Sequence, residues 1–364
     1  MRKIIIFLIF LGILLAGLGG LFLLKKLRQP PLERELNIFN WENYLSEEVV
    51  RDFEKKYQVK VNLETFDDSE SMFSVVQSQP DKYDLVVVPD DLISLMKNLK
   101  LLSPLNHQKI PNLKYLKREA KENHYDPGNV YCVPYVNGYT GIAVNTKYIK
   151  NYDGTRSILW DENYRGRISM LNNAEEILFS ILLYLGYSNI DKLSPEELDS
   201  VLNQAIDLAI KQKDLVLGYD DPIKQRELLL NEEAWVAYIY TTEIADIKQR
   251  NPNIEFFAPK EGVSLWSDNF CIPKDAPHKE VAHAFLNYLL DPKVSAKNSQ
   301  DIKALMVNGE MKKFLDPNFY QLIESLDFPK EKEIFEKSRY YNFRLNIKIQ
   351  TAVNRLAAEL RITE

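Results

Sequence analysis

The chain has 364 residues, of which 45% are hydrophobic and 27% charged, and its formal net charge at pH 7 is −6. This composition is that of a globular protein long enough for two domains, and it excludes a disordered or fibrous chain. The acidic balance argues against nucleic acid as a partner; it is compatible with a cationic ligand and equally with simple solubility.

The first 28 residues form a targeting segment that is separate from the fold. Residues 4–24 are uncharged and long enough to span a bilayer as a helix. The small residues of this run stand inside it, with more apolar residues to follow, so we expect an uncleaved membrane anchor rather than a cleaved signal peptide. The rest of the chain would then be periplasmic or extracytoplasmic, and attached to the inner membrane if residues 1–28 are retained.

Strands and helices alternate after a short polar linker. The apolar periodicity predicts strands at 36–41, 59–66 and 84–88 and helices at 46–57, 69–77 and 91–99. Ser46 and Asp91 stand at the N-cap positions of the first and third helices. Alternation with short joints indicates right-handed crossovers and a parallel sheet that helices cover on both faces.

Two long extended stretches, 130–146 and 264–273, interrupt this alternation. A second unit of strands and helices lies between them, and a helical region follows the second stretch. We therefore expect an α/β protein of two lobes, each a mainly parallel sheet flanked by helices, joined by two extended hinge crossings. The predicted division is 29–138 plus 269–364 for the first lobe and 139–268 for the second.

The sequence gives little support for a catalytic or metal-binding function. The sequence contains no GxSxG, HExxH or GxxxxGK[ST] pattern, so we expect no enzyme and no cofactor. The HKEVAH run at 278–283 has the composition of a metal site, but histidines five residues apart do not share a helix face, and we expect a surface helix there. Cys132 and Cys271 could form a disulfide in an oxidising compartment; we expect two unrelated buried thiols.

The candidate site follows from the position of strand ends. In open parallel sheets, ligands bind beyond the carboxyl ends of the strands. Aromatic and acidic side chains follow three such ends: residues 41–44, Asp90, and the segment from Asn173 to Glu176. Carboxylates hold ammonium groups through charge-assisted hydrogen bonds, and aromatic faces attract cations, so these residue types together indicate an organic cation.

Five motifs carry a resemblance to a known family. They are NWENY (40–44), YDLVVVP (83–89), VPYVNGYTGIAVN (133–145), LGYS (185–188) and PKEGVSLWSDNFCIP (259–273). In order and spacing the chain resembles the extracytoplasmic polyamine-binding proteins of ABC transporters, the spermidine/putrescine-binding family, from about residue 36 to 300. The resemblance implies a two-lobed periplasmic-binding-protein fold of type II. It also implies capture of a linear polyamine for an ABC permease, and we expect a monomer.

The resemblance also implies which residues bind the amine. Trp41 and Tyr44 would cover its methylene chain, Trp266 and Tyr240 would add aromatic faces, and Asp268 would be the main partner of an ammonium group. Glu176 would be a second acidic partner.

Some positions depart from the family pattern. Asn43 and Asn173 stand where acids are expected, with Glu42 beside the first, and Leu92 stands near an expected aromatic. Asp90 and Asp220 replace small polar residues. Positions 42, 43, 90 and 220 all stay candidates for the site. The spacing of charges in this site would then differ from that of the family.

Other readings stay open. The same fold could bind ferric ion, a sugar or a modified amine, or serve as an anchored sensor or adhesin. Adjacent tyrosines bind ferric ion in related proteins, but Tyr340 and Tyr341 fall far from the crossings without a nearby histidine, so we expect them to pack as aromatics.

Overall fold

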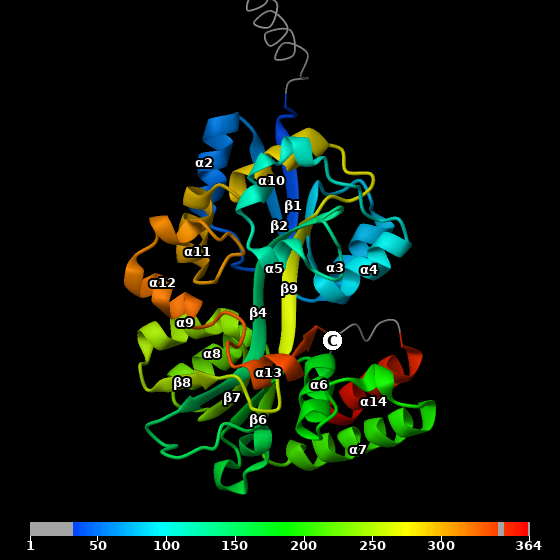
Figure 1. The fold of residues 1–364 in the computed structure, drawn as a ribbon, viewed down its shortest axis with the longest axis vertical. Helices are drawn as coiled ribbons and strands as arrows, with labels where there is room; N and C mark the ends of the chain where they lie inside the picture. Colours follow the sequence, from blue (N-terminus) through cyan, green and yellow to red (C-terminus); the bar gives the residue numbers. More distant parts are fainter. Residues whose placement is uncertain (1–31, 341–345, 363–364) are drawn as a thin grey trace, which may run out of the picture.

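The computed structural model describes residues 32–340 and 346–362. The expected targeting segment at 1–28 and Tyr341 lie outside these residues. Within the described ranges, no helix combines the length and the apolar character needed to cross a membrane. The molecule has two halves stacked along its long axis, and strands β4 (Cys132–Asn145) and β9 (Ser264–Cys271) run between them (Figure 1).

The half with the first three strands is called the first lobe. Its strand β1 lies between β2 and β3 and is parallel to both. The bounds are β1 Glu35–Trp41, α2 Glu47–Tyr57, β2 Lys60–Phe66, α3 Ser69–Ser78, β3 Leu85–Pro89, α4 Asp90–Asn98 and α5 Arg118–Lys121. The predicted alternation and the parallel pairing are confirmed here.

The starts of two helices show how local sequence sets these elements. Helix α2 begins after Ser46, as predicted, because the Ser46 side chain accepts a hydrogen bond from the Val49 N–H. The prediction that Asp91 caps α4 is wrong: Pro89 is the N-cap, and both Asp90 and Asp91 lie in the first turn. Their negative charge is favourable there because the helix dipole is positive at that end.

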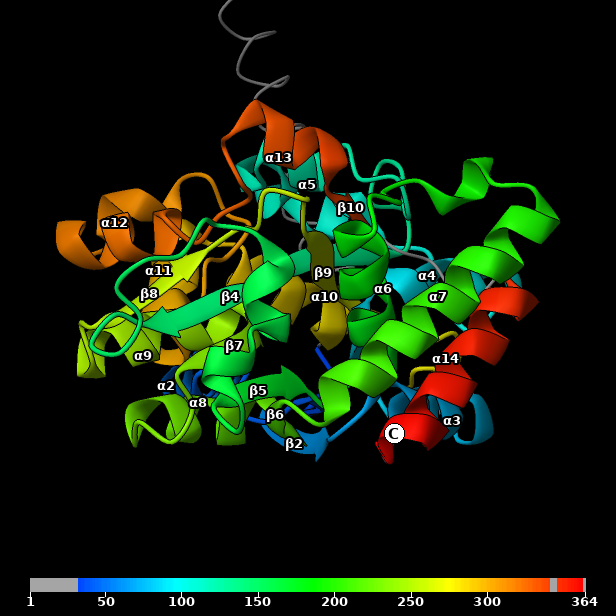
Figure 2. The ribbon, with the colours of Figure 1, turned by 90° about the horizontal axis from the view of Figure 1, so that it is seen from below.

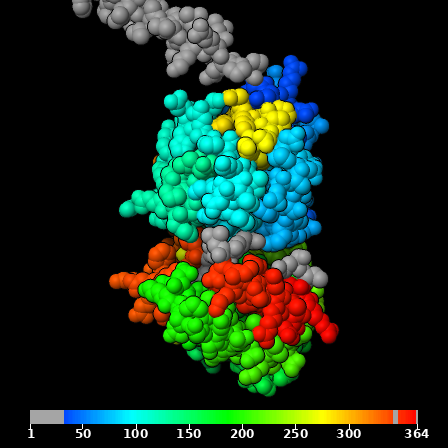
Figure 3. Space-filling view, turned by 90° about the vertical axis from the view of Figure 1, so that its right-hand side faces the viewer, coloured from blue at the N-terminus to red at the C-terminus, as the bar shows by residue number. Residues whose placement is uncertain are grey.

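The other half is called the second lobe. Its strand β5 lies between β6 and β7, again in parallel, and β8 pairs with β4. The bounds are β5 Ile168–Leu171, α6 Ala174–Tyr184, α7 Pro195–Lys213, β6 Val216–Asp220, α8 Pro222–Leu230, β7 Val236–Tyr240, α9 Thr241–Arg250 and β8 Ile254–Phe257. A space-filling view shows the two lobes as distinct masses (Figure 3).

The two crossing strands join the lobes through one continuous sheet. The strand order is β2-β1-β3-β9-β4-β7-β5-β6, and β9 is antiparallel to both β3 and β4. One core cluster lies under the helices of the first lobe and continues to α8 and α9, and a second cluster fills the space between β5, α6 and α7. Each crossing strand therefore belongs to both lobes.

A disulfide joins the two crossings, so the expectation of two unrelated thiols is wrong. Cys132 is the first residue of β4, Cys271 is the last of β9, and the two are direct partners in the antiparallel ladder. Their Cα atoms lie 4.3 Å apart although 139 residues separate them in the chain. This strand register, which brings the two side chains together, is a long-range property that cysteine spacing does not reveal.

The carboxy-terminal helices divide between the lobes. Their bounds are α10 Lys279–Leu289, α11 Pro292–Ile302, α12 Pro317–Glu324, α13 Lys332–Lys337 and α14 Ile347–Leu360, with β10 at Arg339–Tyr340. Val353 and Leu356 of α14 are buried in the core of the second lobe, and α14 lies beside α7 in both ribbon views (Figures 1 and 2). Helix α14 thus departs from the predicted division, which placed 269–364 in the first lobe. The boundaries near 138 and 268 stay a prediction.

Helix α10 is not the surface helix that the HKEVAH run predicted. It packs against the first lobe's core through Val281, Phe285 and Leu286, and His283 is buried with them. The Nε2 atom of His283 accepts the Asn106 N–H at 2.9 Å, so this histidine ties a loop to the helix. The apolar stripe that surrounds the two histidines explains why the helix is covered.

Candidate functional site

Strand β9 places three residues of the candidate site in one row. Ser264, Trp266 and Asp268 alternate along the strand, so their side chains share one face of it. Across the ladder, Gly138 of β4 is the direct partner of Trp266. A Cβ atom at Gly138 would lie 2.5 Å from Cζ2 of the indole, so the missing side chain is what lets the ring lie flat on β4.

Asp268 forms one end of the row, together with Tyr44 of the first lobe. The Tyr44 hydroxyl donates to Oδ2 of Asp268 at 2.8 Å, and the Tyr44 carbonyl accepts a hydrogen bond of 2.6 Å from the Tyr135 hydroxyl. Burial raises the pKa of Asp268 to about 6, and the Tyr44 hydroxyl opposes this shift. Asp268 is therefore a carboxylate that is costly to keep ionised in the empty protein.

Trp41 lies near the Asp268 end of the row. Its indole packs on Phe66, with ring centroids 4.3 Å apart, and is half-buried. The indole N–H lowers the pKa of Asp268, although within the described part of the chain no acceptor lies at hydrogen-bond distance from it. The indole thus packs against the core of the first lobe, and its N–H acts on the Asp268 carboxylate.

Glu176 forms the other end of the row. It lies in the first turn of α6, whose N-cap Asn173 accepts the Glu176 N–H at 3.0 Å. Its two oxygens accept hydrogen bonds from the hydroxyls of Ser264 (2.8 Å) and Tyr238 (3.1 Å). Burial raises the pKa of Glu176, while these hydroxyls and the charge of buried Arg156 act in the opposite direction.

Aromatic rings occupy the space between the two ends. Tyr240 meets Trp266 edge to face, with centroids 5.9 Å apart, and the Trp266 N–H has no hydrogen-bond partner among the described residues. The Asn173 amide lies 3.5 Å from the Tyr240 hydroxyl. Burial raises the pKa of Tyr240, and the charges of Glu176 and Asp268 raise it further, so this phenol lies within the field of both ends of the row.

The structure does not bring every predicted residue to this row. Glu42 and Asn43 are exposed, and Asn43 adopts a positive φ of 56°, a conformation that asparagine tolerates. The Asp220 carboxylate pairs with Lys224 at 2.6 Å. The Asp90 carboxylate accepts the Ser267 N–H at 2.7 Å and so extends the β3–β9 ladder beyond Pro89, a structural role.

Sequence reasoning missed the groups that hold the two acids. Ser264 and Tyr238 donate their hydroxyls to Glu176, Tyr135 holds the main chain of Tyr44, and Gly138 makes room for the indole. A signal for one of them was present, because the alternation in SLWSD already places Ser264 on the face of Trp266 and Asp268. The other three depend on strand pairing.

Tyr340 packs as an aromatic, as predicted, but a histidine does lie nearby. Its ring contacts Phe328, Tyr125 and His124, with the His124 ring centroid 5.1 Å away. Tyr340 pairs with Leu265 in the sheet. In the described ranges, no three His, Cys, Asp or Glu side chains are grouped so as to hold a metal ion.

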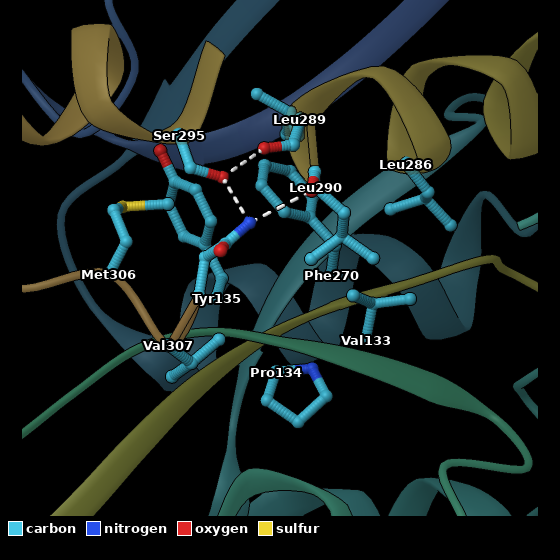
Figure 4. Close-up of a pocket in the computed structure, with 11 residues that line it drawn as sticks. Val133, Pro134, Tyr135, Phe270, Leu286, Leu289, Leu290, Ser295, Met306 and Val307 are labelled. Atoms are coloured by element: carbon cyan, nitrogen blue, oxygen red, sulfur yellow. Dashed lines mark hydrogen bonds between the residues drawn. The ribbon is translucent and has the colours of Figure 1, made fainter. Parts of the chain in front are cut away.

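A small cavity lies elsewhere, in the core of the first lobe. It has a volume of about 10 Å³ and is lined by Tyr135, Phe270, Leu286, Met306 and neighbouring apolar side chains (Figure 4). This is room for about one water molecule, and the polar lining side chains Ser295 and Asn308 already bond to main-chain carbonyls. It is a packing defect and not a solute site.

Comparison with known proteins identifies the family. The family model described as bacterial extracellular solute-binding protein matches residues 48–320. The spermidine/putrescine-binding periplasmic protein 1 of Haemophilus influenzae is 28% identical over 295 residues, which cover 78% of this chain and 79% of that protein. The spermidine/putrescine-binding periplasmic protein of Escherichia coli (strain K12) is 27% identical over 284 residues, which cover 78% of this chain and 80% of that protein.

The solved structures agree with the sequence relatives. A putative spermidine/putrescine ABC transporter from Listeria monocytogenes matches with a TM-score of 0.80 and 28% identity, over 91% of this chain and 99% of that one. The predicted fold class, the two-lobed type II periplasmic-binding-protein fold, is confirmed. With three quarters of its length matched by the family model, the chain belongs to the bacterial extracellular solute-binding protein family.

Proposed function

We propose that this protein captures a linear polyamine of the putrescine and spermidine class outside the cytoplasm and delivers it to the permease of an ABC transporter. The observation that carries the proposal is the row Glu176–Trp266–Asp268, which sets one carboxylate at each end and an indole between them. Ammonium groups would bind the carboxylates, and the methylenes would lie on the rings of Trp266, Tyr240 and Tyr44. The similarity to spermidine/putrescine-binding periplasmic proteins supports the same ligand class.

The lobes would close around the amine by bending at the crossing strands. Contacts between the lobes flank the row: Lys303, at the end of α11, pairs with Asp246 of α9, and Tyr44 lies in the field of Glu243. Closure would remove the amine from water and present a joint surface of both lobes to the permease. We further propose that the protein acts as a monomer held at the membrane by residues 1–28.

The direct test is calorimetry on the full chain in a mild detergent. The titrants are putrescine, cadaverine, spermidine, spermine, ferric citrate and a panel of sugars. We expect one amine to bind with a stoichiometry of one and a Kd of about 1 μM or tighter. Binding of ferric ion or a sugar, with no amine bound at 1 mM or below, would refute the proposal and favour another solute on the same fold.

The affinity for the amine should fall in acid. Because the carboxyl of Asp268 has a pKa of about 6 in the empty protein, it carries a proton below that pH, and the proton must leave before an ammonium can bind. We expect the affinity for the amine to be constant above about pH 7 and to fall by about tenfold for each pH unit below 6. Calorimetry from pH 4.5 to 8 measures this, and an affinity that stays constant down to pH 5 would contradict it.

Gly138→Ala should weaken binding by moving the indole. The new methyl group would lie within 2.7 Å of two indole carbons and 2.2 Å from the Thr241 hydroxyl, so Trp266 must leave its place on β4. We expect at least about a tenfold loss of amine affinity, since the ring supplies both packing and cation–π attraction. Gly309→Ala is the matched control, because its methyl would meet nothing closer than 3.7 Å. Equal affinities in the two variants would argue against the indole as a ligand surface.

A further inference from the structure

The end of the first lobe that lies farthest from the second lobe is called the distal pole. Strands β1 and β2 begin there, since Glu35 pairs with Lys60 in the parallel ladder, and α2 ends there (Figure 1). The turn after α4 and the loop before α10 meet at the same end, where the Lys274 N–H donates to the Leu101 carbonyl at 2.8 Å. The distal pole consists of residues 32–35, 54–60, 78–84, 98–103 and 272–281.

Most acids of the distal pole are held by the protein itself. Glu33 accepts the Val281 N–H at 3.0 Å, at the start of α10, and Glu54 accepts the Val61 N–H at 2.8 Å. Asp84 is fully buried and accepts hydrogen bonds from the groups around it. Three acids of the pole are exposed: Glu35, Asp81 and Asp275.

The basic side chains of the distal pole are mostly exposed and unpaired. Seven Lys and Arg side chains are exposed there, and one of them, Lys82, pairs with Glu64 at 2.9 Å. The other six form no ion pair within the described ranges: Arg34, Lys55, Lys56, Lys60, Lys100 and Lys274. The dipoles of α2 and α4 account for the three at their ends, whereas the other three stand on strand starts and a loop.

This local charge is opposite to that of the body of the protein. The chain has 52 acidic and 46 basic side chains, and five of the basic ones stand in residues 1–28. The rest of the chain is therefore clearly acidic, and an anionic surface would repel it as a whole. The distal pole offers such a surface a local attraction, so that a contact would occur in one orientation of the molecule.

The distal pole also lies close in the chain to the targeting segment. Residues 4–24 are long enough to span a bilayer, and the seven residues KKLRQPP stand between this run and Leu32. Even when fully extended, this connection reaches only about 25 to 30 Å. With residues 1–28 retained, the distal pole stays near the lipid headgroups, whereas the second lobe can lie far from them.

We infer that the distal pole docks on the anionic headgroups of a lipid bilayer. The inference rests on the membrane attachment proposed above. An anionic surface attracts Lys and Arg side chains over about one Debye length, roughly 8 to 10 Å at ordinary salt, and the short connection keeps the six unpaired side chains within reach. The docked protein stands with its second lobe outermost (Figure 1), and docking covers no residue of the row Glu176–Trp266–Asp268, so the site can load in this orientation.

The test is energy transfer on the full chain in lipid vesicles. Both cysteines are held in the disulfide, so a single new cysteine takes a donor dye selectively. The donor is placed at Ser78→Cys, exposed in the distal pole, or at Asn163→Cys, exposed before β5 of the second lobe. The acceptor is on the lipid headgroups, and the vesicles are phosphatidylcholine alone or with about 30% phosphatidylglycerol.

Transfer from position 78 should be at least about twofold higher on the anionic vesicles than on the neutral ones, and about 0.5 M salt should remove the difference. Position 163 should show no such rise. Equal transfer from position 78 on both lipids, or a larger rise at position 163, would overturn the inference and leave the proposed function intact. A chain that floats with neither kind of vesicle in a density gradient would overturn the inference and the membrane attachment, but not amine binding, which calorimetry measures separately.

A triple substitution tests the role of the exposed lysines. Lys55→Gln/Lys60→Gln/Lys274→Gln removes three charges from the distal pole, and we expect it to lose at least about half of the rise at position 78. The matched control removes three exposed charges from the second lobe: Lys192→Gln/Lys211→Gln/Lys260→Gln. It should keep the full rise, and both variants should bind the amine as the native chain does. An equal rise in the two variants would overturn docking through the distal pole.

Discussion

Asp268→Asn is expected to abolish amine binding and to stabilise the empty protein at neutral pH. The variant keeps an oxygen that can accept the Tyr44 hydroxyl bond but removes the charge that an ammonium needs. Loss of one partner of a buried charge pair costs about 2 to 5 kcal/mol, so Kd should rise by about thirtyfold at least. Calorimetry with diaminobutane measures this loss.

The gain in stability follows from linkage. The pKa of Asp268 is about 6 in the folded protein against an ordinary value of 3.8, so its contribution to stability is present below about pH 4 and is lost as pH rises through 6. Asparagine carries no such cost, and the empty variant should melt at a higher temperature than the native chain at pH 7. The two should converge near pH 4.

A matched control separates this effect from a general loss of charge. Asp220→Asn removes a carboxylate that is more deeply buried than Asp268 and is already paired with Lys224. Its amine affinity should stay within about threefold of that of the native chain, because it faces a cation of the protein and not the ligand. Full affinity in the Asp268 variant would show that the row has been misassigned.

Removal of the Cys132–Cys271 disulfide should lower the stability of the protein by up to about 5 kcal/mol. The bridge closes a loop of 139 residues, and a loop of that length restricts the unfolded chain strongly. Urea unfolding of the double variant Cys132→Ser/Cys271→Ser, compared with the native chain, measures the loss. The cysteines lie in the ladder of the two crossings, so we also expect the bridge to hold the register of the hinge strands.

Reduction provides the control for this prediction. Dithiothreitol should shift the urea midpoint of the native chain towards that of the double variant and leave the variant itself unchanged. If the double variant unfolded at the same urea midpoint as the oxidised native chain, the prediction would be contradicted, and the pairing of β4 and β9 would already restrict the chain as much as the disulfide does.

Local structure could be predicted because local rules decide it. Ser46 caps α2 as its side chain and the following acids predict, and the first three strands appear where the apolar periodicity predicts them. The same holds for the row, since Trp266 and Asp268 alternate within one strand whatever the rest of the fold does. Glu176 lies in the first turn of α6, shortly after the end of β5, as its predicted position beyond a strand end requires.

What failed depends on partners far away in the chain. Cys132 and Cys271 meet only because β4 and β9 pair in one register. Asp220 is an exception, because its partner Lys224 lies only four residues further along the chain, in α8. Helix α14 joins the second lobe through an apolar face that fits either lobe on sequence alone. Gly138 reads as an interruption of a strand, and its use appears only when the indole lies on it.

A crystal structure of the full chain with diaminobutane bound tests the central claim most directly. The account predicts one ammonium within about 3 Å of the Asp268 carboxylate, the other at Glu176, and the methylenes against the face of Trp266. A diamine found elsewhere, with the Tyr44–Asp268 hydrogen bond undisturbed and both acids facing only protein, would contradict it.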